Sequence, residues 1–550
     1  MRLTYLLIHV SLLFSNLCLA QDKNLVEPSP TKTAFHQSHT GKIFFTDQRL
    51  SYDSLSEGRF LTTYTLTNKS DLFFVAYFNN SLTNYKHQLL PAYSADTLFK
   101  IGNYQFSIFI DKQLIYQSNL LPGAPQAKNQ DKDTYLNRPF IDNINGQGTW
   151  SESFWNRFMN NGGDKALTDG KHLLKMEIRP YVKTDTLLTG DVIASGELML
   201  EVERQPKIKG RKINLTPVTP YNGLAVSDLP FDKKKIQYLK GAIDEGLFKK
   251  INSIVVIKEG KILIEEYFNG EDRNSLHDPR SVGKSFASTI TGIAINDGFL
   301  QSDTQTISDF YEPYQFQHFT PSKGNATIKE LLTMSSGFDG NDEVEHSAGN
   351  EENMYPTPDW VKFTLDLPYQ DSLKEKWHYF TAGVILLGDM LHKSVPNGLE
   401  KYADEKLFKP LGITNYTWQY TPQNVPNTAG GIQMNALDFA KYGLLYKNGG
   451  SWNNQQVIDP AWVEQSFTKQ RKIADRDNEY YGYLFWNKTF KANHKEYEAY
   501  YCAGNGGNYI LVFKDEPLVI VITASAYGQS YAHSQVTEIL STYLLPAVTK

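Results

Sequence analysis

Residues 280–286 read Arg-Ser-Val-Gly-Lys-Ser-Phe, and this stretch decides the fold of the second half of the chain. Apolar residues recur after it at helical spacing, and Gly298 follows where a helix would end. The pattern predicts a helix over about 281–297 with one buried face. Ser281 and Lys284 are three residues apart, so they lie on the same face of this helix, close to its N-terminus.

The Ser-x-x-Lys spacing is a candidate nucleophile and base. The hydroxyl of Ser281 is a weak nucleophile until a base takes its proton. The amine of Lys284 can take that proton when burial and neighbouring charge favour its neutral form. A serine at a helix N-terminus also has a backbone N–H that can stabilise an oxyanion. The same spacing is typical of a helix cap beside a solvated lysine, so the motif alone leaves both interpretations open.

Five blocks of sequence, in order, resemble the serine beta-lactamase-related hydrolases. This family comprises class C beta-lactamases, penicillin-binding DD-peptidases, and esterases and amidases of the same fold. The resemblance spans about residues 225–548. The blocks are Arg280–Gly298, Thr327–Gly337, Trp377–Gly388, Gly430–Trp462 and Gly504–Asn508.

The resemblance assigns a second motif to the Trp377–Gly388 block. Tyr379 and Thr381 match the Tyr-x-Thr variant of the family's Tyr-x-Asn motif. It implies that the phenol of Tyr379 acts with Lys284 as the general base, or relays the proton to the leaving group. Thr381 is implied to contact the substrate.

The third motif of the family is usually Lys-Thr-Gly or His-x-Gly, and the matching place here is Gly504-Asn505-Gly506-Gly507. The resemblance implies that these residues bind the substrate, with the backbone N–H of Asn505 or Gly506 joining that of Ser281 in an oxyanion hole. No Lys-Ser/Thr-Gly sequence occurs in the chain. In penicillin-recognising members this cationic motif helps to hold the substrate carboxylate. Its absence favours an ester or amide with a neutral acyl portion over an efficient beta-lactamase reaction.

The chain has 550 residues, which is more than one core usually holds. We expect a signal peptide over 1–20, a flexible leader over 21–40, a β-rich domain of one or two modules over 41–205, a linker over 206–224, and a serine hydrolase domain over 225–550. The predicted fold class is therefore multi-domain, with a sandwich-like β-rich N-terminal region followed by an α+β beta-lactamase/transpeptidase-like domain. That second domain is expected to contain an antiparallel sheet flanked by helices.

The N-terminus predicts export. Arg2 precedes a short apolar run, and Ala20 is a plausible cleavage point. We expect a periplasmic or secreted protein, with lipid anchoring at Cys18 as the less favoured alternative. No later apolar stretch approaches the roughly 20 residues of a membrane helix, so no transmembrane segment is predicted.

Composition excludes several function classes. The chain has 55 Lys and Arg against 60 Asp and Glu, a net charge of −5, and no long basic run, which argues against a nucleic-acid partner. Two cysteines are too few for a disulfide framework or a cysteine-based zinc site. No sequence motif calls for a metal or an organic cofactor.

The resemblance implies an exported serine hydrolase that cleaves a small-molecule or oligomeric ester or amide through an acyl-enzyme on Ser281. One alternative is a peptidoglycan-directed DD-peptidase or D-amino-acid amidase that binds penicillin. Another is a non-catalytic binding protein with a relic site. The N-terminal domain is expected to position the enzyme at a surface, to bind a glycan or polymer, or to mediate dimerisation, and the sequence does not choose among these roles.

Overall fold

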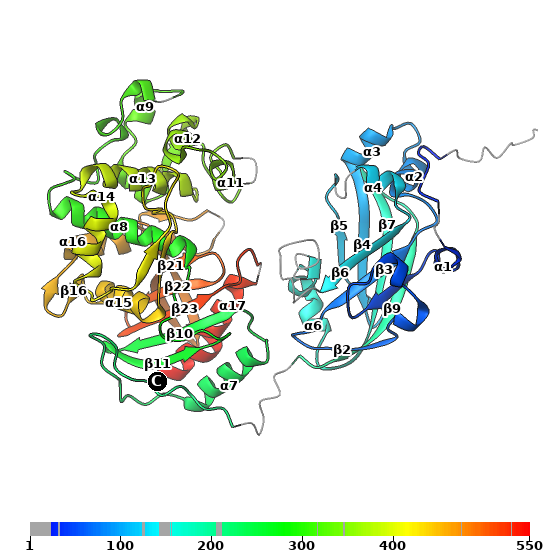
Figure 1. The fold of residues 1–550 in the computed structure, drawn as a ribbon, viewed down its shortest axis with the longest axis horizontal. Coiled ribbons are helices and arrows are strands. Elements are labelled where there is room, and N and C mark those ends of the chain that lie inside the picture. Colours follow the sequence, from blue (N-terminus) through cyan, green and yellow to red (C-terminus); the bar gives the residue numbers. More distant parts are fainter. Residues whose placement is uncertain are drawn as a thin grey trace, which may run out of the picture. The chain divides into compact units, whose positions relative to one another are not determined.

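The computed structural model describes residues 24–549 apart from 31–32, 124–126, 142–153, 156, 205–211, 316, 345–346, 475 and 530. The predicted signal peptide, residues 1–20, lies outside the described residues. The chain divides into two units, Met1–Arg204 and Gln205–Lys550 (Figure 1). Among the described residues, no helix has both the length and the apolar character that crossing a bilayer requires.

The N-terminal unit is built on two sheets. One is antiparallel, in the order β1 (Ile43–Thr46), β3 (Leu72–Tyr77) and β6 (Tyr135–Ile141). The other has the order β2 (Thr63–Leu66), β9 (Ala194–Val202), β7 (Gly170–Lys183), β4 (Gly102–Ile110) and β5 (Gln113–Asn119), with β8 (Leu187–Thr189) paired to β7. Strands β2 and β9 are parallel, whereas the other pairs in this sheet are antiparallel. The helices are α1 (Ala34–His39), α2 (Leu82–Leu89), α3 (Ala95–Ile101), α4 (Ala127–Lys132) and α6 (Asp164–Ala166).

One buried cluster joins the two sheets of the N-terminal unit. Alternate residues of β7 and β9 point into it, among them Met176 and Leu200, together with Phe74 of β3 and Phe140 of β6. The period-two alternation therefore places one face of each strand in a shared core, and the N-terminal region is β-rich as predicted. Residues 33–40 of the predicted leader include α1, in which His36 and His39 are buried.

The C-terminal unit contains an eight-stranded antiparallel sheet. Its order is β11 (Lys261–Tyr267), β10 (Ile251–Lys258), β23 (Leu518–Ala524), β22 (Asn508–Phe513), β21 (Lys495–Gly504), β20 (Trp486–Ala492), β19 (Tyr480–Tyr481) and β18 (Arg471–Lys472). The β10–β23 pair joins strands from opposite ends of the unit. Short two-stranded sheets pair β12 (Ser336–Phe338) with β13 (Tyr369–Lys374), β14 (Tyr416–Trp418) with β15 (Ile432–Met434), and β16 (Ser451–Trp452) with β17 (Gln455–Gln456).

Helices cover both faces of the large sheet. Alternation along β22 and β23 sends Val512 and Val521 to one face, and Leu511 and Ile520 to the other. The first face packs against α8 (Gly283–Asn296), α13 (Thr381–Ser394) and α15 (Ala436–Lys447). The second packs against α7 (Lys233–Asp244), α17 (Ala532–Glu538), the π-helical turn η8 (Ile539–Leu544) and α18 (Leu545–Val548). Figure 1 shows α8 and α13 on the opposite side of this sheet from α7.

The remaining helices of the unit surround the α8–α13 layer. They are α9 (Pro321–Gly324), α10 (Ile328–Leu332), α11 (Glu351–Met354), α12 (Trp360–Asp366), α14 (Gly398–Ala403) and α16 (Pro460–Phe467). The β10–β11 hairpin turns at Glu259 and Gly260, which both have positive φ, of 51° and 76°. Two successive residues with positive φ form a tight turn whose twist matches that of the flanking strands β10 and β11.

Candidate active site

Ser281 and Lys284 are in direct contact at the start of α8. Ser281 belongs to a single 3₁₀ turn, Arg280–Val282, that runs directly into the helix. The Nζ atom of Lys284 donates one hydrogen bond to Ser281 Oγ at 2.7 Å and another to the carbonyl of Ala429 at 2.8 Å. The pair that sequence spacing places on one helix face is therefore within hydrogen-bond reach, which a nucleophile and its base require.

The backbone around Ser281 is constrained. Arg280 has a φ of 54°, in the left-handed region that a residue with a side chain seldom adopts. Its N–H donates to Asp278 Oδ1 at 3.0 Å, and its guanidinium lies 4.6 Å from the ring centroid of Tyr527. A Cβ on Gly283 would come within 3.0 Å of the Cα of Gly430, so α8 begins tightly packed against that segment. These contacts fix the direction of the Ser281 side chain.

Tyr379 lines the same cavity as Ser281, which has a volume of about 670 Å³. The ring of Tyr379 stacks on Trp486 of β20, with centroids 5.7 Å apart and planes at 23°. Lys284 Nζ lies 5.1 Å from the centroid of the Tyr379 ring. The structure thus brings together all three residues that the sequence singles out as catalytic candidates.

Asp342 anchors the segment that carries Tyr379, and no sequence motif points to this residue. Its carboxylate accepts hydrogen bonds from the backbone N–H groups of Thr381 and Glu351, both at 2.8 Å. Its own N–H donates to the carbonyl of Tyr379 at 2.8 Å. Burial raises the pKa of the Asp342 carboxyl, while its hydrogen bonds with Thr381 and the charge of Lys284 oppose that rise.

Thr381 is the first residue of α13, so Asp342 also places a carboxylate at the N-terminus of that helix. Thr381 is buried and does not belong to the described lining of the cavity. Its observed contact is this backbone hydrogen bond. The predicted contact between Thr381 and a substrate stays a prediction.

The third motif lies beside the nucleophile. Strand β21 ends at Gly504, where a Cβ would come within 1.9 Å of the carbonyl oxygen of Pro279 and 3.1 Å of the nitrogen of Ser281. Only a glycine permits this approach. Asn505 follows and lines the cavity, and its Oδ1 accepts a hydrogen bond from the N–H of Gly528 at 2.9 Å.

Gly506 and Gly507 form the turn between β21 and β22. Both have positive φ, of 92° and 91°, which explains the glycines at these positions. A Cβ on Gly506 would meet the ring of Tyr527, and one on Gly507 would meet the carbonyl of Ala532. Neither glycine belongs to the described lining of the cavity, so the motif contributes Gly504 and Asn505 to that surface.

Charged side chains that sequence reasoning missed also line this cavity. Arg476 donates to Glu343 Oε1 at 2.6 Å and lies 3.6 Å from Glu479 Oε2. Lys488, on β20, is a second cation of the lining. Glu343 lies 133 positions before Arg476, and no motif marks these residues, so only the fold shows that they share one cavity.

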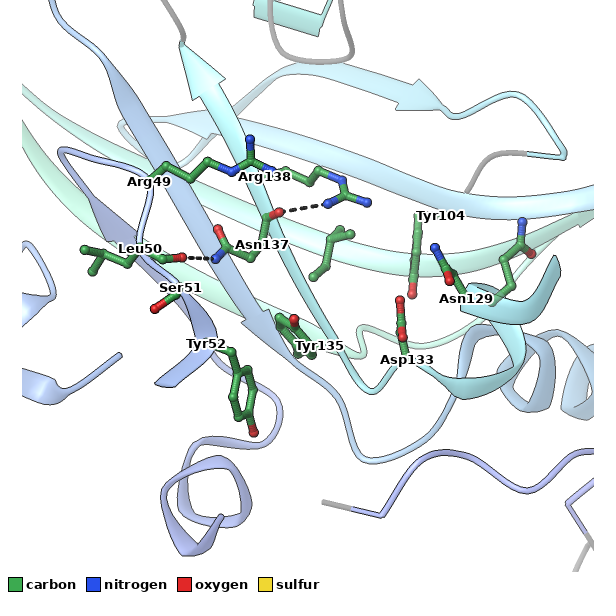
Figure 2. A pocket seen from close by; sticks show the side chains of 12 residues that line it. Arg49, Leu50, Ser51, Tyr52, Tyr104, Asn129, Asp133, Tyr135, Asn137 and Arg138 are labelled. Carbon is green, nitrogen blue, oxygen red and sulfur yellow. Dashed lines mark hydrogen bonds between the residues drawn. The ribbon is translucent and has the colours of Figure 1, made fainter. Parts of the chain in front are cut away.

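The N-terminal unit has a smaller cavity of about 250 Å³ (Figure 2). Figure 2 shows the side chains of Arg49 and Arg138 close together at one side of it, and Tyr52 and Tyr135 at another. The side chain of Asn137 donates to the carbonyl of Leu50 at 2.8 Å and so joins β6 to the loop after β1. This cavity contains no serine–lysine pair among its described lining residues, and the nucleophile candidate belongs to the C-terminal unit.

Comparison with known proteins agrees with this geometry. A family model described as "Beta-lactamase" matches residues 248–543, more than half of the chain. The curated protein "Beta-lactamase-like protein 2" of Dictyostelium discoideum is 24% identical over 238 residues, which are 40% of this chain and 40% of that protein. The match thus spans less than half the length of this curated relative.

Similar solved structures include the octameric penicillin-binding protein homologue from Pyrococcus abyssi, with 17% identity over 57% of this chain and 79% of that chain and a TM-score of 0.44. Another is the penicillin-binding protein from Bacillus halodurans, with 18% identity over 53% of this chain and 97% of that chain and a TM-score of 0.43. With the family model matching residues 248–543, the chain belongs to the beta-lactamase family.

Proposed function

We propose that this protein is an exported serine hydrolase that cleaves a carboxylic ester or amide through an acyl-enzyme on Ser281. The observation that carries the proposal is the 2.7 Å contact between Lys284 Nζ and Ser281 Oγ, at the wall of a cavity that Tyr379 and Gly504 also line. Acyl transfer needs a nucleophile, a base and a backbone that lies close to both.

In the acylation step, the neutral amine of Lys284 accepts the proton of the Ser281 hydroxyl as Oγ attacks the carbonyl carbon of the substrate. The backbone N–H groups of Ser281 and Asn505 donate to the oxyanion that forms. Tyr379 gives its phenolic proton to the leaving alcohol or amine and takes up the proton held by Lys284, and the leaving group departs as the carbonyl re-forms. Water then attacks the acyl-enzyme, the same groups move its proton to Ser281 Oγ, and the carboxylic acid leaves.

Mass labelling of the intact protein tests this assignment. A fluorophosphonate is expected to add once to the wild-type protein and not to add to Ser281→Ala. Ser288→Ala is the matched control, because Ser288 lies on the same helix and its buried hydroxyl has no hydrogen-bond partner among the described residues. It should label like the wild type. Label on Ser281→Ala, or no label on the wild type, would contradict the proposal.

Labelled penicillin, used in parallel, separates the alternatives. Fluorophosphonate capture without penicillin capture supports an esterase or amidase. Capture of both probes at Ser281 favours the peptidoglycan-directed enzyme. Capture of neither favours a binding protein with a relic site.

The export part of the proposal rests on the sequence of residues 1–20. Protein recovered outside the cytoplasm of expressing cells is expected to begin at Gln21. A lipid-modified Cys18 at the N-terminus would support the anchored alternative. Protein that stays in the cytoplasm with an intact Met1 would contradict export.

A further inference from the structure

Among the described residues, Lys488 is a cation of the cavity that has no ion-pair partner. It lies on β20 and lines the cavity that contains Ser281. Its Nζ is 4.8 Å from the ring centroid of Phe490 and 5.8 Å from that of Tyr501. It forms no ion pair and donates no hydrogen bond to any residue that the structure describes. An ammonium held against aromatic rings, without a carboxylate, retains the capacity to bind an anion.

The other charged groups of this cavity are already partnered. Arg476 is held by Glu343 and Glu479. Three other acidic or basic side chains of the described lining also have hydrogen-bond partners: Asp342 accepts from two backbone N–H groups, Glu351 accepts from the Tyr355 hydroxyl, and His533 shares a hydrogen bond with the Tyr509 hydroxyl. Lys488 is therefore the charged residue of this described lining to which a ligand would supply an ion-pair partner.

Electrostatics agree with this geometry. Burial lowers the pKa of Lys488, and the positive charge of Arg476 acts in the same direction, whereas Glu479 opposes it. The charge of Glu479 is shared with Arg476, which it faces at 3.6 Å. A carboxylate bound at Lys488 would offset the cost of burying the ammonium.

The position of Lys488 along the sheet separates its ammonium from the nucleophile Ser281. Its ammonium lies against Tyr501, whereas the nitrogen of Ser281 lies against Gly504 on the same strand. In the register of β20 and β21, Lys488 lies opposite Ala499, which is five residues before Gly504. A group bound at Lys488 is thus several bonds from the carbonyl that Ser281 attacks.

We propose that Lys488 binds a carboxylate of the substrate that lies several bonds away from the scissile ester or amide carbonyl. This inference rests on the proposed hydrolase function and names the substrate class. The third motif lacks the cation that would bind a carboxylate close to the reacting carbonyl, and Lys488 supplies one farther along the cavity. The expected substrate is uncharged near the scissile bond and anionic at its far end.

The test compares matched pairs of 4-nitrophenyl esters. In each pair the acyl chain ends in a carboxylate or in its neutral methyl ester, and the chain length increases from pair to pair. A second series carries the carboxylate on the leaving group. The variants are Lys488→Gln and Lys488→Arg. Lys491→Gln is the control, because this lysine lies on the same strand outside the cavity lining, with its side chain 79% exposed.

The wild type is expected to prefer the carboxylate ester over its neutral partner in the longer chains of one series. Lys488→Gln should lower kcat/KM for that ester by roughly 10- to 100-fold, mainly through KM, because it removes one charged hydrogen bond. The loss on the neutral ester should be much smaller than the loss on the carboxylate ester. Lys488→Arg should retain most of the preference, and Lys491→Gln all of it.

Two results would overturn the inference while the proposed function stands. One is Ser281-dependent turnover with no carboxylate preference at any length. The other is an equal loss on both esters in Lys488→Gln, which would mean that Lys488 only supports packing. If neither series is hydrolysed in a Ser281-dependent manner, the proposed function fails and this inference with it.

Discussion

The carboxylate of Asp342 accepts a 2.8 Å hydrogen bond from the backbone N–H of Thr381, a residue 39 positions later in the chain. The N–H of Asp342 donates in return to the carbonyl of Tyr379. Asp342 is thus hydrogen-bonded to the backbone on both sides of Phe380, where α13 begins. These two contacts hold the backbone of the segment that carries the Tyr379 phenol.

Asp342→Asn is expected to lower kcat by about 10- to 100-fold, because a small displacement of a catalytic group has effects of that size. The amide keeps one acceptor oxygen but presents an N–H₂ group to the second backbone donor. Steady-state kinetics with any ester that Ser281 hydrolyses would measure the change. Asp339→Asn, a nearby substitution outside the cavity lining, should leave kcat unaltered. An equal fall in both variants would show that the effect is not specific to the Tyr379 segment.

Gly504→Ala is expected to lower kcat by about 100-fold, the typical effect of losing one oxyanion donor. The new methyl group would lie 1.9 Å from the carbonyl oxygen of Pro279, so the end of β21 must move away from Ser281 and carry the Asn505 N–H with it. Gly58→Ala is the control, because a Cβ there meets nothing within 4 Å. Circular dichroism would verify that the sheet is intact. Unchanged turnover in Gly504→Ala would exclude this backbone from the oxyanion hole.

Features that depend on local spacing could be predicted from the sequence. The helix predicted over about 281–297 is present as the 3₁₀ turn at Arg280–Val282 followed by α8 (Gly283–Asn296). It could be predicted because its apolar face and the glycine that ends it lie within one short stretch of sequence. Leu174, Met176 and Ile178 alternate with charged residues in the sequence, a pattern that predicts one buried strand face, and all three side chains are buried in β7.

Features that depend on distant contacts could not be predicted. The hydrogen bond between Asp342 and Thr381 and the position of Lys488 in the cavity exist only once the chain has folded. The pairing of strands in the N-terminal unit is similar, because alternation shows which face is buried but not which strands are neighbours. The parallel pair of β2 and β9 joins residues more than 130 positions apart.

Trp486 is expected to support catalysis through the Tyr379 ring that stacks on it at 5.7 Å. Trp486→Ala should reduce kcat/KM by about tenfold, since aromatic pairs contribute about 0.5–1.5 kcal/mol beyond the area that they bury. Trp486→Phe keeps a ring at this position and should restore most of the activity. If the alanine and phenylalanine variants lose the same activity, stacking is not the reason. The rate of fluorophosphonate labelling gives the same comparison without a substrate.

Lys86 is expected to make the stability of the protein depend on pH. It is fully buried and donates to the carbonyls of Leu98 and Gly102 and to the side chain of Gln130, all neutral acceptors. Burial lowers its pKa from 10.5 to about 8. Below pH 8 the lysine is charged in both states, and the folded protein bears the full cost of burying that charge. Between pH 8 and 10.5 the unfolded state binds more protons, so the free energy of unfolding from this group rises with pH, by about 3 kcal/mol in all.

Lys86→Met should abolish this contribution, and urea unfolding of the full chain at pH 7.5 and pH 10 measures it as the difference between wild type and variant. Other titrating groups, including the buried Lys323, are present in both proteins and cancel in that difference. The free energy of unfolding of Lys86→Met, minus that of the wild type, should be lower at pH 10 than at pH 7.5. Only the wild type gains stability from deprotonation of this lysine. Lys128→Met, on the exposed side of α4, should follow the wild type at both pH values. A wild-type-to-Lys86→Met difference that does not change with pH would mean that Lys86 holds its proton in the folded protein throughout this range.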